Sequence, residues 1–218
     1  MQHCYISSSA GPSVKVLIIE DHPIVVSGCR ALFAADSDVE LFDAPSLRVG
    51  REFYARYKPD VTVVDINLPD GSGLDLSRDI VAADSSAKVV VFSMSDAPVL
   101  ALRALEFGAK GYVSKTGDPV SLRDAVYSVA RGERWLPTSM VQEVALMRVD
   151  GNNRMAALTD REVQILRALV RGMSMAEIAE EIDVCYKTVA SDCATIRSKF
   201  NARTTSEMVR IASELRIV

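Results

Sequence analysis

The sequence of 218 residues has no long apolar run and no stretch that resembles a targeting signal. Its strand-like apolar runs, such as residues 89–92, are only a few residues long, whereas a membrane-spanning helix needs about 18. The first thirteen residues contain no Lys or Arg and no long apolar stretch, so we expect no secretory signal. These absences favour a soluble protein of the cytoplasm.

Cysteine is scarce, and its spacing does not fit a metal site or a disulfide framework. The four cysteines are Cys4, Cys29, Cys185 and Cys193, and no two of them form a Cys-x-x-Cys pair. The sequence has only two His, His3 and His22, so no His-x-x-x-His pair accompanies these cysteines as a zinc-binding pattern would require. We therefore expect reduced thiols, as is usual in the cytosol.

An excess of basic charge is also absent. Residues 156–218 hold nine Lys and Arg and nine Asp and Glu, which leaves sixteen of the 25 basic and twenty of the 29 acidic residues in the rest of the chain. Because neither part is strongly basic, any binding of nucleic acid must come from a local patch. At about 150 residues per domain, the length suits one ordinary domain and one short one.

The first two thirds of the chain alternate between short apolar runs and segments of helical length. This alternation predicts an α/β fold with a doubly wound, five-stranded parallel sheet, covered by helices on both faces. The strands are expected at residues 14–19, 39–42, 61–64, 89–92 and 111–113, and the helices at 24–34, 47–57, 74–83, 99–107 and 120–131.

A small all-α module is expected at the C-terminal end. Thr159 with Glu162, Ser174 with Glu177, and Thr204 with Glu207 are spaced as capping boxes, which predict three helix starts. Between the last two, residues 186–200 place Val189, Cys193, Ile196 and Phe200 on one helical face. We predict a leader at 1–13, a first domain at 14–135, a linker at 136–155 and a helix-turn-helix domain at 156–218. Residues 139–147 are compatible with a linker helix.

Chemically active side chains stand where four of the predicted strands end: Glu20 and Asp21, then Asp65, Ser93 and Lys115. The carboxyl ends of parallel strands meet at one edge of a sheet, so the fold brings these groups together. Clustered carboxylates repel one another unless a cation neutralises them, and oxygen ligands favour Mg²⁺. A carboxylate beside Mg²⁺ is suited to attack a phosphoryl donor, while a hydroxyl and an ammonium bind the new phosphoryl oxygens.

The segments around these residues resemble the receiver domain of two-component signalling, which has a flavodoxin-like fold. The matching segments are Glu20-Asp21, Val-Val-Asp65-Ile-Asn67-Leu-Pro-Asp-Gly-Ser-Gly, Ser93, and Gly-Tyr112-Val-Ser-Lys115. The resemblance implies that Asp65 accepts phosphate from a histidine kinase and that Lys115 binds it. It also implies that Ser93 and Tyr112 form a switch pair, which shifts inward on phosphorylation. The implied Mg²⁺ ligands are Glu20, Asp21, Asp65 and the backbone carbonyl of Asn67.

Two alternatives concern this pocket. The haloacid-dehalogenase phosphatases also use an Asp nucleophile on such a sheet, but they need a second Asp where this sequence has Asn67. His22 and Pro23 follow the first acidic pair, and we interpret them as a helix start rather than as a metal site.

The C-terminal module resembles the LuxR-type helix-turn-helix. The resemblance is carried by Leu158-Thr-Asp-Arg-Glu162, Gly172-Met-Ser, Glu177-Ile-Ala-Glu, Lys187-Thr-Val189 and Ile196-Arg-Ser-Lys199-Phe200. With the receiver it forms the NarL/FixJ type of two-component response regulator. This family implies DNA binding as a dimer, with 186–200 as the recognition helix. The last helix, 206–215, is expected to supply the dimer contact through Met208, Ile211 and Leu215, or else only to close the small core.

The recognition helix departs from the family pattern. Cys185 replaces a usual Ser and loses a helix cap, which costs about 1 kcal/mol. Ala190, Asp192 and Ala194 stand where the family has polar, neutral or basic residues, so Asp192 either faces phosphate unfavourably or accepts from a cytosine amino group. The expected DNA contacts are Lys187, Thr188, Ser191, Asp192, Thr195, Arg197 and Lys199.

These observations predict a regulator rather than an enzyme. Asp65 receives phosphate from a histidine kinase with Mg²⁺, and the chain then regulates transcription by binding promoter DNA as a homodimer, without any membrane partner. The alternative function keeps the receiver but lets the divergent helix-turn-helix act through protein partners or through weak DNA binding only. The electrical neutrality of residues 156–218, together with Ala190 and Asp192, favours this alternative, whereas the capping boxes and Lys187-Thr-Val189 favour the first.

Overall fold

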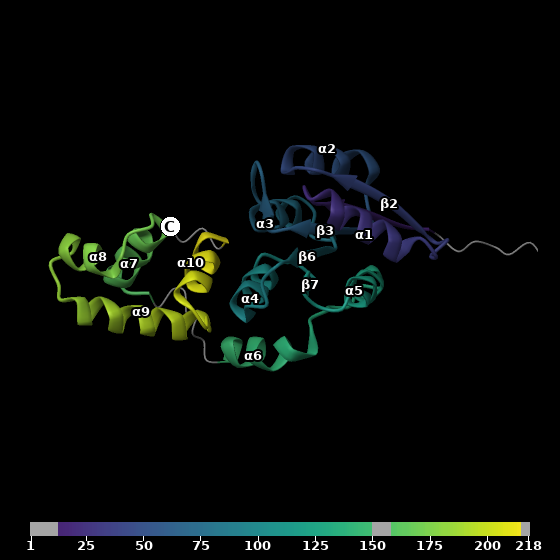
Figure 1. Ribbon diagram of the computed structural model, residues 1–218. Helices are drawn as coiled ribbons and strands as arrows, with labels where there is room; N and C mark the ends of the chain where they lie inside the picture. The colour runs from purple at the N-terminus through teal and green to yellow at the C-terminus, as the bar shows by residue number, and fades with distance from the viewer. Residues whose placement is uncertain (1–12, 150–157, 215–218) are drawn as a thin grey trace, which may run out of the picture.

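The computed structural model describes residues 13–149 and 158–214 (Figure 1). The predicted leader falls outside this range except for its last residue, as do Cys4, the whole polar segment 150–154 and Leu215. None of the described helices has the length and apolar character that crossing a bilayer requires.

A five-stranded parallel sheet forms the centre of the first domain, as predicted. Its strand order is β2-β1-β3-β6-β7. After β1, the chain adds β2 on one side and then β3, β6 and β7 on the other, so the order of the strands changes direction between β1 and β3. The strands are β1 (Val14–Ile19), β2 (Val39–Ala44), β3 (Val61–Asp65), β6 (Val89–Ser93) and β7 (Gly111–Ser114). Each begins at the predicted residue, and four of them run one or two residues further.

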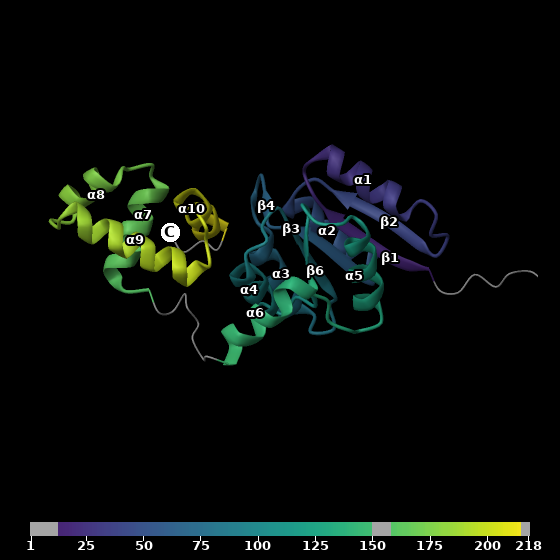
Figure 2. The ribbon, with the colours of Figure 1, turned by 60° about the horizontal axis from the view of Figure 1, so that its bottom comes forward.

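Five helices cover the sheet on both faces (Figure 2). They are α1 (Pro23–Phe33), α2 (Leu47–Tyr57), α3 (Gly73–Ala83), α4 (Pro98–Glu106) and α5 (Val120–Ala130). Val16 and Ile18 pack with α1 and α5, whereas Leu17 and Ile19 join the cluster on the opposite face. The strands are therefore apolar without alternation because both of their faces are buried.

A short hairpin follows the central strand and was not predicted. Its strands, β4 (Asn67–Leu68) and β5 (Gly71–Ser72), are antiparallel and have two residues each. Two residues are too few to produce a recognisable period in the sequence. The hairpin leads from the carboxyl edge of the sheet directly into α3.

The expected linker contains a helix, α6 (Thr138–Val149), which is longer than the 139–147 considered from the sequence. Its buried residues Met140, Val144 and Met147 belong to the main core cluster, and the helix packs against α4 (Figure 2). Val141 and Leu146 on its other side are exposed. The linker helix is thus attached to the receiver.

The C-terminal domain consists of α7 (Asp160–Val170), α8 (Met175–Glu181), α9 (Tyr186–Phe200) and α10 (Thr205–Glu214). The capping boxes of α7 and α8 have both of their reciprocal hydrogen bonds, as predicted. The third box differs, because the Glu207 carboxylate accepts from the backbone N–H of Arg203 rather than from that of Thr204. Val189, Cys193, Ile196 and Phe200 form the buried face of α9 that the spacing predicted.

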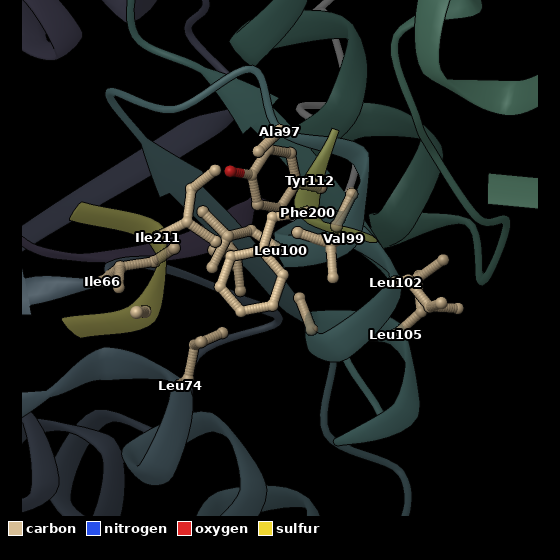
Figure 3. Close-up of a cluster of buried hydrophobic side chains, with 14 of the residues drawn as sticks. Ile66, Leu74, Ala97, Val99, Leu100, Leu102, Leu105, Tyr112, Phe200 and Ile211 are labelled. Carbon is tan, nitrogen blue, oxygen red and sulfur yellow. The ribbon is translucent and has the colours of Figure 1, made fainter. Parts of the chain in front are cut away.

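The two domains touch through α10 and the end of α9. Phe200 and Ile211 lie beside Leu100 and Tyr112 of the receiver in one apolar cluster (Figure 3). The side-chain amide of Asn201 also donates to Glu143 of α6 over 2.7 Å. The C-terminal domain is therefore docked on the side of the receiver where α4 lies.

Candidate functional site

The predicted acidic residues meet at the carboxyl edge of the sheet. Glu20 follows β1 and Asp65 ends β3, and both side chains are buried. The Lys115 ammonium lies 2.5 Å from Glu20 Oε2 and 2.9 Å from Asp65 Oδ2, with its side chain only 5% exposed. The topology therefore places the lysine between the two carboxylates, as the strand ends predicted.

The charge balance of Asp65 is set by burial and by this lysine. Burial raises the pKa of the Asp65 carboxyl, and the nearby Glu20 charge acts in the same direction. The hydrogen bond and positive charge of Lys115 oppose both effects. Lys115 thus supplies the positive charge that favours the ionised, nucleophilic form of the carboxylate.

The donor set around Asp21 fits a divalent cation. Ligand atoms of Glu20, Asp21, His22 and Asp65 all lie within 4.8 Å of one another. Asp21 Oδ1 is buried and accepts no hydrogen bond from the described part of the chain, although His22 Nδ1 is 3.0 Å away. The same nitrogen lies 2.8 Å from Glu20 Oε1, and its one proton can serve only one acceptor. Three carboxylates with an unsatisfied oxygen have the chemistry that Mg²⁺ prefers.

His22 starts α1, as predicted, but it also belongs to the acidic cluster. It occupies the N-cap position, with Pro23 in the first turn. Its imidazole hydrogen-bonds Glu20, and this bond together with the charge of Asp21 raises the pKa of His22 above its usual value. The sequence analysis missed this second contact, for which the only signal was that His22 directly follows Glu20 and Asp21.

The predicted switch residues are joined by a third residue that the sequence analysis missed. Ser93 Oγ accepts a hydrogen bond from the backbone N–H of Ser95 over 3.1 Å. The Tyr112 hydroxyl donates to the carbonyl of Ser95 over 2.8 Å, and its ring is fully buried. The β6–α4 loop therefore links the buried tyrosine to Ser93.

Gly73 is a further site residue that the sequence analysis missed. It opens α3, and its backbone N–H donates to the Ile66 carbonyl over 2.8 Å. A Cβ atom added at this position would lie 1.8 Å from the backbone carbonyl oxygen of Asp65. The start of α3 can therefore pass this close to Asp65 only with glycine at position 73.

The residues predicted to contact DNA all lie on α9, but their exposure differs. Lys187, Ser191 and Thr195 are exposed, whereas Thr188, Asp192, Arg197 and Lys199 are partly buried. Cys185 occupies the N-cap of this helix without a side-chain cap bond, as expected from the loss of Ser. The exposed face also carries Ala194, so it offers few long side chains.

Two of the charged residues on α9 are already paired with the first turn of α7. Arg161 binds both carboxylate oxygens of Asp192, at 2.8 and 3.3 Å. The Lys199 ammonium lies 2.7 Å from each oxygen of Glu162. The sequence analysis treated Asp192 and Lys199 as charges facing DNA, but the structure gives each of them a partner within the domain.

The last helix contacts the switch region of the receiver. Arg210 Nη2 donates to Ser95 Oγ over 3.1 Å, and the Asn67 amide donates to Glu214 over 3.2 Å. Met208 and Ile211, which were expected either to form a dimer contact or to close the core, are fully buried within this chain. In this arrangement they are not available to a second copy.

A buried, lysine-paired aspartate at the end of the central strand of such a sheet, followed by a helix-turn-helix module, is the combination typical of a receiver joined to a DNA-binding effector. Residues 16–127 match the response regulator receiver domain, and residues 156–212 match the luxR family of bacterial regulatory proteins. The chain belongs to the two-component response regulators with a LuxR-type helix-turn-helix, as the sequence predicted. It is a phosphorylation-controlled transcription regulator. The receiver match supports this class over the haloacid-dehalogenase alternative.

Known proteins resemble the whole chain. The methanol utilization control regulatory protein MoxX of Paracoccus denitrificans is 32% identical over 206 residues, which cover 93% of this chain and 92% of that protein. A nitrate/nitrite response regulator homolog of Haemophilus influenzae is 31% identical and covers 86% and 90%, respectively. The structure of RcsB in complex with DNA has the same fold, with a TM-score of 0.77 at 22% identity over 93% of this chain and 99% of that one.

Proposed function

We propose that Asp65 is the phosphoacceptor and that a histidine kinase is its donor. The observation that carries this proposal is the contact of Lys115 with Asp65 and Glu20 at the carboxyl edge of the sheet. A carboxylate oxygen of Asp65 attacks the phosphorus, the bond to the donor breaks, and an acyl phosphate forms. Lys115 and the Ser93 hydroxyl then bind the new phosphoryl oxygens.

Mg²⁺ is the cofactor that these residues fit. When bound, it neutralises charge on the phosphoryl oxygens and on the clustered carboxylates. The residues that would hold it are Glu20, Asp21 and Asp65 through their carboxylates, and Asn67 through its backbone carbonyl. The unsatisfied oxygen of Asp21 supports this assignment.

Labelling with phosphate tests the role of Asp65. Acetyl phosphate and Mg²⁺ should label the wild-type chain once, and Asp65→Asn should abolish the labelling. Asp96→Asn is a suitable control, because this exposed carboxylate bonds Thr116 near the site and is not one of the proposed ligands. If Asp65→Asn is still labelled, at a residue then mapped by mass spectrometry, the proposed phosphoacceptor is wrong.

We assign the docked arrangement to the unphosphorylated protein and the DNA-bound form to a homodimer. In the docked arrangement Met208 and Ile211 are fully buried; α10 packs against α7 and α9, and Ile211 also lies beside Leu100 of the receiver (Figure 3). Most of α9 extends away from the receiver (Figure 1). We infer that docking limits access to the expected dimer surface, while most of the recognition helix lies outside this contact. Phosphorylation acts on the contact between α10 and the receiver through the switch region. Ser93 Oγ accepts from the backbone N–H of Ser95, and Ser95 Oγ accepts from Arg210 of α10.

We further propose where the chain acts and which partners it has. The chain acts on promoter DNA in the cytoplasm, is not an enzyme, and has a histidine kinase and its own second copy as partners. We keep the division into residues 14–135, 136–155 and 156–218, with α6 as the helical part of the linker. These boundaries stay predictions.

A second candidate function is regulation through a protein partner, with only weak DNA binding. It is favoured by Ala190 and Ala194 on α9 and by the engagement of Asp192 and Lys199 with α7. Genome-wide capture with the phosphorylated protein distinguishes the two functions. Enrichment of discrete duplex sites supports the first function, whereas absence of any enriched site supports the second.

A further inference from the structure

The ion pair between α7 and the recognition helix gives Asp192 a different role from the two considered on sequence grounds. Arg161 Nε lies 2.8 Å from Asp192 Oδ2, and Arg161 Nη2 lies 3.3 Å from Oδ1. The Asp192 side chain is only 16% exposed, whereas that of Arg161 is 54% exposed. The carboxylate is thus turned toward α7, and the guanidinium is the part of the pair that solvent reaches.

The pair lies on one defined side of the recognition helix. Asp192 and Lys199 are seven residues apart, which is about two helical turns, so they share a side of α9. Both are paired with neighbouring residues of α7, namely Arg161 and Glu162. The first turn of α7 therefore borders the recognition helix along this side.

An unpaired carboxylate on a recognition helix would be repelled by the phosphates of duplex DNA. Here Arg161 neutralises that charge, and the Nη1 end of its guanidinium takes no part in the pair. A guanidinium fixed through one edge loses little further entropy when its other edge binds phosphate. Arg161 lies beside one side of the recognition helix, where the DNA backbone borders the major groove that such a helix enters, so its cation is placed for phosphate rather than for a base.

We propose that Arg161 binds a DNA phosphate beside the major groove and that Asp192 is the positioning residue that holds its guanidinium there. This inference rests on the DNA-binding function given above. It predicts a result opposite to ordinary charge repulsion, because removal of the negative charge of Asp192 weakens DNA binding. The pair lies at the surface of the domain, with Arg161 half-exposed, and a surface ion pair adds little to stability, so the variants should stay folded.

The experiment uses the full chain treated with acetyl phosphate and Mg²⁺, and a labelled 30-base-pair duplex of random sequence. Dissociation constants are measured over a series of KCl concentrations for the wild type and for Arg161→Ala, Asp192→Ala and the double variant. Arg161→Ala should weaken binding several-fold and reduce the salt slope by about 0.9, the value of one phosphate contact on duplex DNA. Asp192→Ala should change both quantities in the same direction, and the double variant should match Arg161→Ala.

Two further variants make the comparison specific. Asp192→Glu keeps the carboxylate and should restore most of the affinity. Arg171→Ala removes a guanidinium of similar exposure that pairs with Glu181 of α8, and it should leave the salt slope unchanged. Thermal melting of each variant verifies that the domain is folded.

The outcomes separate this inference from the function on which it rests. Tighter binding by Asp192→Ala would show that this carboxylate repels the DNA and would overturn the inference. An unchanged salt slope in Arg161→Ala would also overturn it, since the pair would then be only structural. If the phosphorylated wild type binds no duplex even at low salt, the DNA-binding function itself fails, and this inference fails with it.

Discussion

Gly73 and Gly28 are two helical glycines with opposite surroundings. A Cβ atom at Gly73 would lie 1.8 Å from the Asp65 carbonyl oxygen, whereas a Cβ atom at Gly28 would meet nothing within 4 Å. We expect Gly73→Ala to lower the free energy of unfolding by about 1–3 kcal/mol, because the backbone of the site must move. Gly28→Ala should raise it by about 0.5–1 kcal/mol, since glycine is a poor helix former. Urea denaturation measures both changes, and equal effects at the two positions would contradict this explanation.

We also predict that the side chain of Met94 limits the access of water to the acyl phosphate. Its side chain is 58% exposed directly after Ser93, and it borders the same cavity as Lys115. A side chain at this position can obstruct the water that must approach the phosphorus in line. We expect Met94→Ala to lose phosphate several-fold faster, as followed by the decay of the labelled chain. A decay rate equal to that of the wild type would show that Met94 does not limit access to water.

At the scale of single elements, Glu162 connects the start of α7 to α9. Its carboxylate accepts from the backbone N–H of Thr159 and pairs with Lys199, so it caps one helix and anchors another. Burial opposes ionisation of this group, but the bonds to Lys199 and Thr159 outweigh it and lower the pKa of Glu162 below its usual range. The ionised form therefore stabilises the folded domain.

The direction of this shift predicts how acid affects the C-terminal domain. The contribution of Glu162 is complete above the unfolded pKa of about 4.3 and is lost as the pH falls through that value toward the folded pKa. Glu162→Gln should destabilise α7 by about 1–3 kcal/mol near neutral pH and should reduce its sensitivity to acid. Hydrogen exchange of the α7 amides in the full chain measures both effects.

Glu177 provides the matched control for this prediction. It completes the capping box of α8 in the same way, but it is exposed, and no lysine or arginine within residues 13–149 and 158–214 is paired with it. Glu177→Gln should therefore have a smaller effect than Glu162→Gln. If the two variants are equally destabilised, the bond between Glu162 and Lys199 contributes little.

At the scale of the whole molecule, a few polar contacts and one apolar cluster hold the C-terminal domain against the receiver. The side-chain amide of Asn67 in the receiver donates to Glu214 of α10, and Ser95 Oγ of the receiver accepts from Arg210 of α10. Phe200 and Ile211 add apolar contact with the receiver (Figure 3). In the docked arrangement Met208 and Ile211 of the expected dimer surface are fully buried.

A double variant of the receiver tests this coupling while it leaves the surface of α10 intact. Asn67→Ala with Ser95→Ala removes both hydrogen bonds, which should shift the equilibrium from docked to undocked by roughly tenfold. We expect a larger radius of gyration in X-ray scattering and more dimer in sedimentation, both without phosphate. Arg171→Ala, in an ion pair between α7 and α8, should change neither measurement. An unchanged radius in the double variant would show that these two hydrogen bonds do not control docking.

The elements with strong periodicity could be predicted almost to the residue. Leu47–Tyr57 and Tyr186–Phe200 begin and end where the sequence placed them, because their apolar spacing and flanking turns are local properties. The hairpin of Asn67–Leu68 and Gly71–Ser72 was missed, since two-residue strands have no period. Glu20, Asp65 and Lys115 were predicted to meet because parallel topology fixes where strand ends lie.

The sequence by itself determined the receiver fold, the grouping of its acidic residues and the apolar face of α9, because these depend on periodicity and on the order of strands. Only the tertiary structure decided which polar groups become partners. Asp192 lies beside Arg161, thirty-one residues away in the chain, and Ser95 lies beside Arg210, 115 residues away. Such pairs depend on how completed elements pack, and no local pattern in the sequence encodes the distance between their side chains.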